Sequence, residues 1–87
     1  MNVAGVSFKQ NELKALMSSK NETVIFKAII ENEPTNSYDP NAKKVICNGY
    51  HIGYIPKDLT QIYSEKEYDV EIYWWKSKYM YMAKIII

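Results

Sequence analysis

The sequence predicts an α+β domain that is mainly β: a small six-stranded, mostly antiparallel β-barrel with two short helices. The chain has 87 residues, which is enough for one domain and too few for a three-layer α/β architecture. Short runs rich in Ile, Val and Tyr recur between turn-forming residues, as strands do. Only two segments show the apolar spacing of a helix, and no linker or repeat divides the chain. Residues 1–87 are therefore predicted to form a single domain.

The amino-terminal residues predict a strand followed by a helix. The segment "NVAGVSF" (2–8) has the composition of a strand, and Gly5 within it indicates a bulge or a close approach of another backbone. The segment "KQNELKALMSSKN" (9–21) predicts a helix that Asn11 caps and "SSKN" (18–21) ends. Its apolar stripe, spaced i, i+3, i+4, consists of Leu13, Leu16 and Met17.

A strand and a hairpin follow. The segment "ETVIFKAIIENE" (22–33) is largely apolar on both of its alternating faces, which indicates a strand covered on both sides or curled into a barrel. The segment "KKVICNGYHIGYIP" (43–56) predicts a hairpin with Asn48-Gly49 in a type I′ turn. Gly53 in the second strand of this hairpin indicates a bend or a close backbone approach.

The remaining residues predict a second helix and a second hairpin. The segment "PKDLTQIYSEKE" (56–67) begins with a proline that the first turn of a helix tolerates. Its inward stripe consists of Leu59, Ile62 and Tyr63. The tail "YDVEIYWWKSKYMYMAKIII" (68–87) predicts a hairpin that turns at Lys76-Ser77. The resulting order, β-α-β-β-β-α-β-β, is related in shape to the OB-fold.

Most aromatic side chains must pack in the core of so small a domain. We assign Phe26, Tyr63 and Trp74 to the core. Because neighbouring strand residues point to opposite faces of a sheet, Trp75 is expected to be partly exposed.

The charge and the single cysteine exclude several classes of protein. Net charge is +1 and all eleven basic residues are lysines, so any phosphate binding is expected to be modest and salt-sensitive. Cys47 alone allows no intrachain disulfide and no cysteine-rich zinc site, and its apolar neighbours predict a buried thiol. No signal-peptide pattern and no membrane-length apolar run occur. We therefore expect an intracellular, cytoplasmic protein that does not bind a membrane. If the protein is bacterial, we expect it to associate with the nucleoid.

No arrangement of residues predicts catalysis. The only histidine, His51, lies within a predicted strand, where a structural role is expected. The acidic residues of the tail are spaced along a helix end and an exposed strand face: Glu65, Glu67, Asp69 and Glu71. There is no glycine-rich phosphate loop, nucleophile elbow or metal-ligand cluster. The sequence therefore predicts no enzyme, no metal and no cofactor.

The polar stretch "NEPTNSYDPNAKKV" (32–45) leaves two interpretations open. It contains two prolines and reads as a loop, yet Tyr38 and Asp39 stand at its centre. In the first interpretation, Asp39 only closes a turn through the nearby backbone, because Asp39-Pro40 is a turn-forming pair. In the second, the exposed aromatic ring and the carboxylate form a binding surface.

Three segments together resemble the HIRAN domain: "VAGVSF", the strand and loop ending "ENEPTNSYDPNAKKV", and "NGYHIGYIPKDL". The family hallmark N-P-Y-D-x-N-A corresponds to residues 36–42, and I/V-G-Y/H-I/L-P corresponds to residues 52–56. The resemblance runs from about Val3 to Tyr63. It implies a small OB-like barrel with two helices. HIRAN domains occur fused to SNF2-type DNA translocases that remodel stalled replication forks, or alone in bacteria and phages, and the best understood bind single-stranded DNA at its free 3′ end.

The resemblance implies a role for each of six residues. Tyr38 would pack against the terminal nucleotides, with Phe8 facing it across the strand end. Asp39 would accept a hydrogen bond from the 3′-hydroxyl, and a carboxylate at that point repels a 3′-phosphate. Asn36 would form the pocket wall. The predicted nucleic-acid-binding residues are Phe8, Asn36, Tyr38, Asp39, Tyr54 and Lys57.

Tyr54 and Lys57 would contact the phosphates, and Lys57 would add its charge to the backbone amides at a helix start. The expected partners are single-stranded DNA and a DNA translocase or repair protein, with the domain itself a monomer acting in DNA repair and replication-fork processing. The alternative is a protein-interaction module that has kept the fold and lost DNA binding. Three features favour this alternative. Ser7 stands where DNA-binding members carry a basic residue, and the net charge is near neutral. The segment 21–42 is also acidic, since it holds Glu22, Glu31, Glu33 and Asp39 against Lys27 alone.

Overall fold

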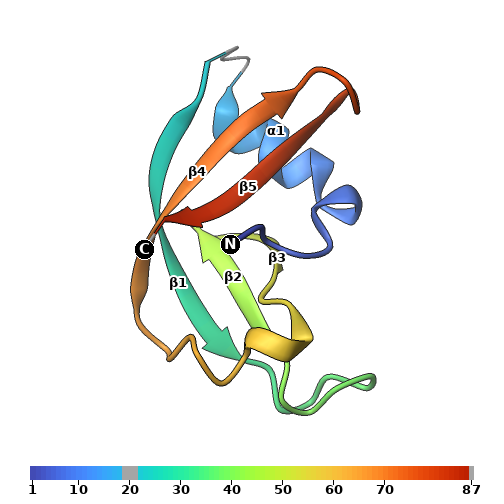
Figure 1. Ribbon diagram of the computed structural model, residues 1–87, viewed down its shortest axis with the longest axis vertical. Helices are drawn as coiled ribbons and strands as arrows, with labels where there is room; N and C mark the ends of the chain where they lie inside the picture. Colours follow the sequence, from blue (N-terminus) through green and yellow to red (C-terminus); the bar gives the residue numbers. More distant parts are fainter. Residues whose placement is uncertain (19–21, 87) are drawn as a thin grey trace.

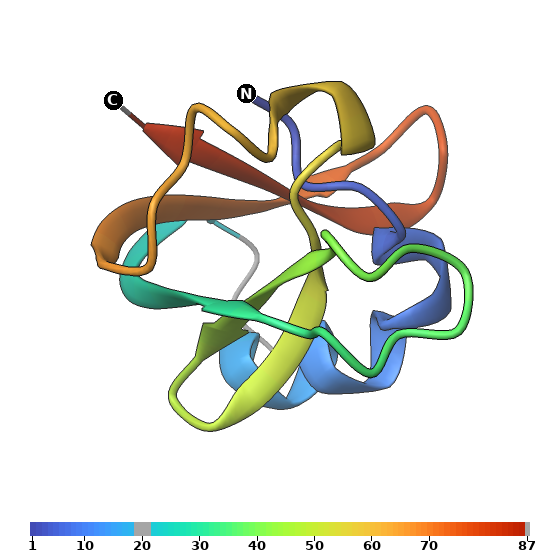
Figure 2. The ribbon, with the colours of Figure 1, turned by 90° about the horizontal axis from the view of Figure 1, so that it is seen from below.

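The computed structural model describes residues 1–18 and 22–86, and they form a curled antiparallel sheet with one α-helix against it (Figure 1). The strand order across the sheet is β3-β2-β1-β4-β5. Figure 2 shows that the sheet bends into an open half-barrel. The elements are η1 (Val6–Phe8), α1 (Gln10–Met17), β1 (Val24–Asn32), β2 (Lys43–Cys47), β3 (Tyr50–Tyr54), the 3-10 turn η2 (Lys57–Leu59), β4 (Glu67–Trp75) and β5 (Met80–Ile86).

The amino-terminal segment 1–4 links the two edge strands of the sheet. The N–H of Val3 donates to the carbonyl oxygen of Ala83 in β5 over 2.9 Å. Ala4 exchanges two hydrogen bonds of 2.8 and 2.9 Å with Tyr54 in β3. At this crossing a Cβ atom on Gly53 would lie 2.5 Å from the carbonyl oxygen of Ala4. The close backbone approach predicted at Gly53 is therefore confirmed, and it closes the open side of the half-barrel.

Helix α1 packs its predicted apolar stripe into the core. Leu13, Leu16 and Met17 are all buried, and the helix lies against β3 and β5. The predicted cap was wrong: Lys9 occupies the N-cap without a side-chain hydrogen bond, and Asn11 lies inside the first turn. The helix ends at Met17, because Ser18 adopts the left-handed conformation with φ 49°. The other residues of the predicted stop signal, 19–21, lie outside the described residues.

Two predicted elements did not form, so the described residues contain five strands and one α-helix. Residues 2–8 make only isolated bridges at Asn2 and Ala4, and then Gly5, with φ 73°, turns the chain into η1. Residues 56–67 form only the turn η2, after which Ile62 is 67% exposed. A short helix depends on packing of its apolar face, and of the predicted stripe only Tyr63 is buried.

Both predicted hairpins are present. Asn48 and Gly49 have φ values of 50° and 82°, as a type I′ turn requires. The β4–β5 hairpin turns through residues 76–79, and Trp75 beside it is 38% exposed, as expected. Of the two alternatives predicted for β1, the curled strand is the one observed, and cover on both faces is excluded because Ile25 is 61% exposed.

The predicted core aromatics differ in how deeply they pack. Tyr63 is buried in the core, and Phe26 packs at its edge. Trp74 is half-buried and lies edge-to-face with Tyr79 and Tyr81, at centroid distances of 5.0 and 4.9 Å. Cys47 is fully buried, and burial raises the pKa of its thiol to about 11, which keeps it unreactive. No helix in the described ranges is long and apolar enough to cross a membrane.

We expect Gly53→Ala to destabilise the domain by at least about 2 kcal/mol, because the new methyl group collides with the backbone of Ala4 and forces the two strands apart. Urea unfolding followed by tryptophan fluorescence measures this change. Gly49→Ala is the matched control: its Cβ meets nothing within 4 Å, so it should lose only about 1 kcal/mol from the left-handed turn. Equal losses for the two variants would contradict the proposed crossing.

Candidate functional site

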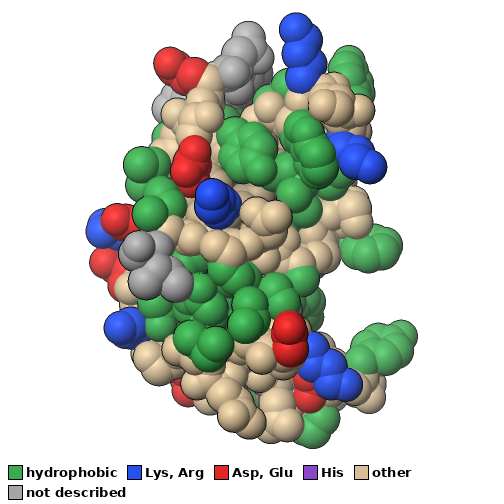
Figure 3. All heavy atoms as spheres, viewed as in Figure 1, with side chains coloured by type: hydrophobic (Ala, Val, Ile, Leu, Met, Phe, Trp, Pro, Cys, Tyr) green, Lys and Arg blue, Asp and Glu red, His purple; other side chains and the backbone are tan. Residues whose placement is uncertain are grey.

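A cavity of about 690 Å³ lies between the loop 33–42 and the end of β3. Its volume falls within the range of small-ligand sites, about 300–1,000 Å³. Figure 3 shows the hollow at this side of the molecule, with apolar side chains projecting above and below it. Its lining includes five of the six predicted binding residues: Asn36, Tyr38, Asp39, Tyr54 and Lys57.

The loop is held in a defined shape by Asn36. The Asn36 Oδ1 atom accepts hydrogen bonds from the backbone N–H groups of Tyr38 and Asp39, at 2.9 and 3.0 Å. At the base of the loop the N–H of Glu33 donates to the carbonyl oxygen of Ala42 over 2.8 Å. The turn presents the Tyr38 ring to solvent, where it is 96% exposed. Asn36 thus orders the loop as well as lining the cavity.

Asp39 combines both of the roles considered from the sequence. Its Oδ1 atom accepts a hydrogen bond of 2.9 Å from the N–H of Asn41, which closes the turn. Its Oδ2 atom has no hydrogen-bond partner among the described residues. One carboxylate oxygen therefore holds the turn, and the other can accept a hydrogen bond from a ligand.

Glu33 ties the loop to the sheet, a role that the sequence analysis missed. Its Oε1 atom accepts hydrogen bonds from Nδ2 of Asn36 at 2.6 Å and from the hydroxyl of Tyr54 at 2.8 Å. Lys44 Nζ lies 4.0 Å from its other oxygen. These hydrogen bonds, the one from Asn36 first, lower the pKa of the Glu33 carboxyl below 4.5. The three-residue spacing to Asn36 was visible in the sequence, but the contact with Tyr54 across 21 residues was not.

Tyr54 forms a rigid wall of the cavity. Its ring packs edge-on against His51, with centroids 4.8 Å apart, and His51 Nε2 lies 2.9 Å from the carbonyl oxygen of Gly53. Burial, followed by the nearby charge of Lys9, lowers the pKa of His51. Burial and the bond to Glu33 raise the pKa of Tyr54. The Tyr54 hydroxyl proton is therefore engaged by Glu33, and a phosphate contact at this atom would have to replace that hydrogen bond.

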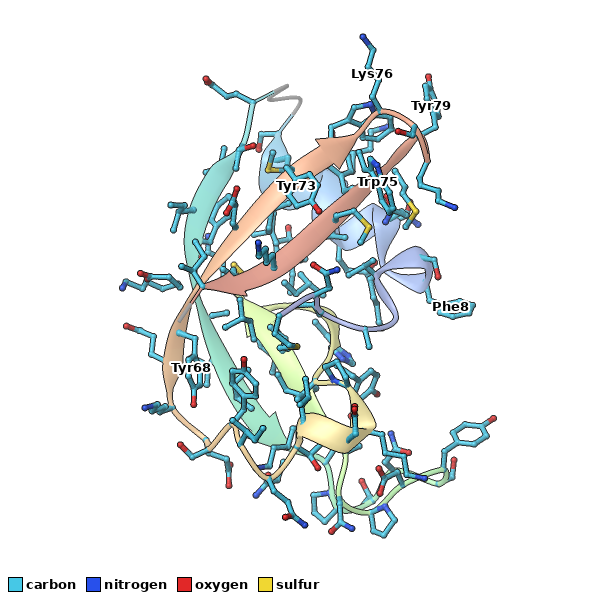
Figure 4. All side chains as sticks on the ribbon, in the orientation of Figure 1. Phe8, Tyr68, Tyr73, Trp75, Lys76 and Tyr79 are labelled. Atoms are coloured by element: carbon cyan, nitrogen blue, oxygen red, sulfur yellow. The ribbon has the colours of Figure 1, made fainter. Side chains whose placement is uncertain are left out.

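The remaining two predicted residues lie differently. Lys57 is exposed and lines the cavity, but it starts only the three-residue turn η2, so the expected contribution of helix-end amides is absent. Phe8 does not line the cavity. Its side chain is 86% exposed and projects from η1 on the right-hand side of Figure 4. The structure thus brings five of the predicted residues together and leaves Phe8 beside them.

No three metal-ligating side chains gather anywhere in residues 1–18 and 22–86. Comparison with protein families matches residues 2–76 to the family model described as the HIRAN domain. Comparisons with curated proteins and with solved structures found no match.

We expect Glu33→Ala to loosen the loop, because it removes the acceptor that joins Asn36 to Tyr54. The backbone amides of Tyr38 and Asp39 should then exchange with deuterium about tenfold faster, which nuclear magnetic resonance can measure. Glu31→Ala is the matched control, since Glu31 is exposed on β1 in the same sheet. Unchanged exchange in the Glu33 variant would show that this carboxylate does not order the loop.

The lowered pKa of Glu33 also predicts a pH dependence of stability. Because the folded state holds the carboxylate charged, the unfolded state takes up the proton first as the pH falls below 4.5. The stabilisation is present above pH 4.5 and is lost as the pH falls through the folded-state pKa. Melting temperatures of the wild type and Glu33→Gln should therefore differ near neutral pH and converge in acid. A constant difference at all pH values would contradict this.

Proposed function

Because this chain belongs to the HIRAN domain family, we propose that it is a non-enzymatic module that binds single-stranded DNA and takes a free 3′-hydroxyl end into the cavity beneath the loop 33–42. The observation that carries the proposal is the gathering of the family motif in one cavity. Asn36, Tyr38 and Asp39 from the loop face Tyr54 and Lys57 from the end of β3 and the start of η2.

The charges of the cavity favour a strand end over an internal nucleotide. Asp39 and Glu33 line it beside the single cation Lys57, among the described residues. A backbone phosphate at that position would be repelled, whereas a terminal hydroxyl can donate to the free Oδ2 atom of Asp39. The two carboxylates of the cavity therefore agree with recognition of a terminal hydroxyl, which carries no charge, rather than of a phosphate.

Stacking supplies the attraction that the weak positive charge lacks. The Tyr38 ring is almost fully exposed and is positioned by the hydrogen bonds to Asn36, so it can stack on the terminal base. Phe8, on η1, offers a second exposed ring on the same side of the molecule. A base stacked on an aromatic ring gains about 1–3 kcal/mol. Lys57 at the cavity mouth would face the phosphate that precedes the end nucleotide.

We extend the proposal to the cellular role implied by the family. A module that captures 3′ ends can hold a partner enzyme, such as a DNA translocase or a repair protein, at a stalled or broken strand. The module itself is proposed to act as an intracellular monomer in DNA repair and replication. Pull-down with the purified domain, followed by size-exclusion chromatography, tests the partner and the oligomeric state.

We expect Asp39→Asn to remove the discrimination between strand ends. Asparagine keeps an oxygen that can accept the turn-closing bond from Asn41, so the loop should survive while the charge is lost. Wild type should bind a short 3′-hydroxyl oligonucleotide about tenfold more tightly than its 3′-phosphate form, and the variant should bind both alike. Fluorescence anisotropy measures both affinities.

Asp58→Asn is the matched control, because Asp58 is an exposed carboxylate of η2 outside the cavity lining. It should leave the discrimination intact. Equal wild-type affinity for the two end groups would reject end capture.

A protein-interaction module is the second candidate. It is favoured by the net charge of +1 and by the acidic lining of the cavity. It would be supported by the absence of any salt-dependent DNA binding at low ionic strength, together with a co-purifying partner that Tyr38→Ala releases.

A further inference from the structure

The end of the β4–β5 hairpin carries an exposed group of aromatic rings and lysines that the cavity does not use. This hairpin platform consists of Trp75, Lys76, Lys78 and Tyr79. Tyr79 is 82% exposed, Trp75 is 38% exposed, and Lys78 Nζ lies 5.7 Å from the centroid of the Trp75 ring. Lys78 and Tyr79 lie outside the matched residues 2–76, so they are features of this chain rather than of the family match.

Tyr79 is the last residue of the four-residue loop 76–79 that joins β4 to β5, and the turn places its backbone in the left-handed conformation. Its φ is 52°, in the left-handed region where glycine or asparagine sits without strain and a bulky residue does not. The ring touches Trp74 edge-on at 5.0 Å, yet this contact leaves most of it in solvent. The turn accounts for the backbone conformation but not for an exposed tyrosine at a position that glycine or asparagine would occupy with less strain, so the ring is available to contact a partner.

The charge at this end of the molecule is opposite to that of the cavity. The hairpin end, residues 72–83, contains Lys76 and Lys78 and no Asp or Glu. Figure 3 shows lysines among the apolar side chains over β4 and β5. Rings interleaved with lysines suit a partner that is anionic and carries planar groups, which describes the phosphates and unpaired bases of a single strand.

Element η1 lies between the cavity and the hairpin platform. The side chain of Gln10 donates to the carbonyl oxygen of Tyr81 at 2.9 Å and accepts from its N–H at 2.8 Å, which joins the start of α1 to the start of β5. On the other side, the Ala4–Tyr54 pair joins the segment before η1 to the cavity wall. Phe8, on η1, therefore lies between the cavity and the hairpin platform.

The three most exposed aromatic rings of the described residues mark one side of the molecule: Tyr38 at 96%, Phe8 at 86% and Tyr79 at 82%. Figures 1 and 2 both place the loop 33–42, η1 and the hairpin turn on this side. Figure 4 shows Phe8 and Tyr79 projecting from it. The loop and the hairpin turn lie toward opposite ends of the longest dimension, which is 35 Å.

We propose that the hairpin platform binds the part of a single strand that precedes the captured end, so that the strand runs from the cavity past Phe8 to Tyr79 and Trp75. This inference rests on the proposed capture of a 3′ end and adds the direction and length of the bound strand. Bases stack on the rings, and Lys76 and Lys78 face the phosphates. The footprint is several nucleotides, within the range of about 4–16 for an OB-type domain.

The test compares 3′-hydroxyl oligothymidylates of about three and about ten nucleotides by fluorescence anisotropy. Wild type should bind the longer one at least about tenfold more tightly. Tyr79→Gly should lose most of this gain and should leave the affinity for the shorter oligonucleotide unchanged. It should not lower the melting temperature, because glycine relieves the left-handed strain. Tyr79→Phe keeps the ring and should keep the gain.

The lysines are tested by the salt dependence of binding to the longer strand. Lys76→Ala with Lys78→Ala removes two phosphate contacts and should reduce the slope of log affinity against log salt by about 1.4. Lys27→Ala with Lys66→Ala removes the same charge from the region of Tyr68, on the opposite side in Figure 4, and should change the slope little.

The outcomes separate the two proposals. The hairpin platform is overturned, while end capture stands, if affinity does not rise with the length of the oligonucleotide. It is also overturned if the rise survives Tyr79→Gly and the Lys76 and Lys78 changes. Equal binding of 3′-hydroxyl and 3′-phosphate strands, with a length gain that depends on Tyr79, rejects end capture and supports the platform. Loss of a co-purifying protein in these variants, without any effect on DNA, assigns the surface to protein docking and overturns the inference.

Discussion

The pairing of residues 1–4 with both edges of the sheet is the constraint on which the rest of the structure depends. Val3 bonds to β5 and Ala4 bonds to β3, and the crossing is possible because Gly53 has no side chain. Unpaired sheet edges are otherwise free to pair with other chains. The same crossing sets where Gly5 turns the chain into η1, and therefore where Phe8 projects.

A second layer of order comes from one carboxylate oxygen of Glu33. By accepting from both Asn36 and Tyr54, it connects a polar loop to a sheet edge that is itself held by Ala4. A loop rich in turn-forming residues would otherwise sample many conformations. With the loop fixed, Asp39 presents an oxygen toward the cavity. A charge that looked unfavourable for DNA binding thus has a structural reason to be there.

The net charge of +1 hides a separation of charge within the molecule. Two carboxylates, Glu33 and Asp39, line the cavity, and Lys76 and Lys78 of the hairpin platform lie toward the other end of the long axis. A DNA strand complements this separation, because its hydroxyl end is uncharged and the phosphates that precede the end are negative. Electrostatic interactions between exposed groups are screened beyond about 10 Å, so the local arrangement matters more than the total.

The sequence by itself determined the features that depend on near neighbours: the apolar stripe of α1, the Asn48-Gly49 turn, both hairpins and the family motif whose residues line the cavity. The tertiary structure decided whatever depends on distant partners. Residues 2–8 form no regular strand because only Asn2 and Ala4 form bridges, to β5 and β3, before Gly5 turns the chain into η1. Residues 56–67 form no α-helix, and Ile62 of their apolar stripe is left exposed. The hydrogen bond between Glu33 and Tyr54 joins residues that are far apart in the chain. The exposed rings of Tyr38, Phe8 and Tyr79 also come from distant segments, and only the curl of the sheet places them on one side of the molecule.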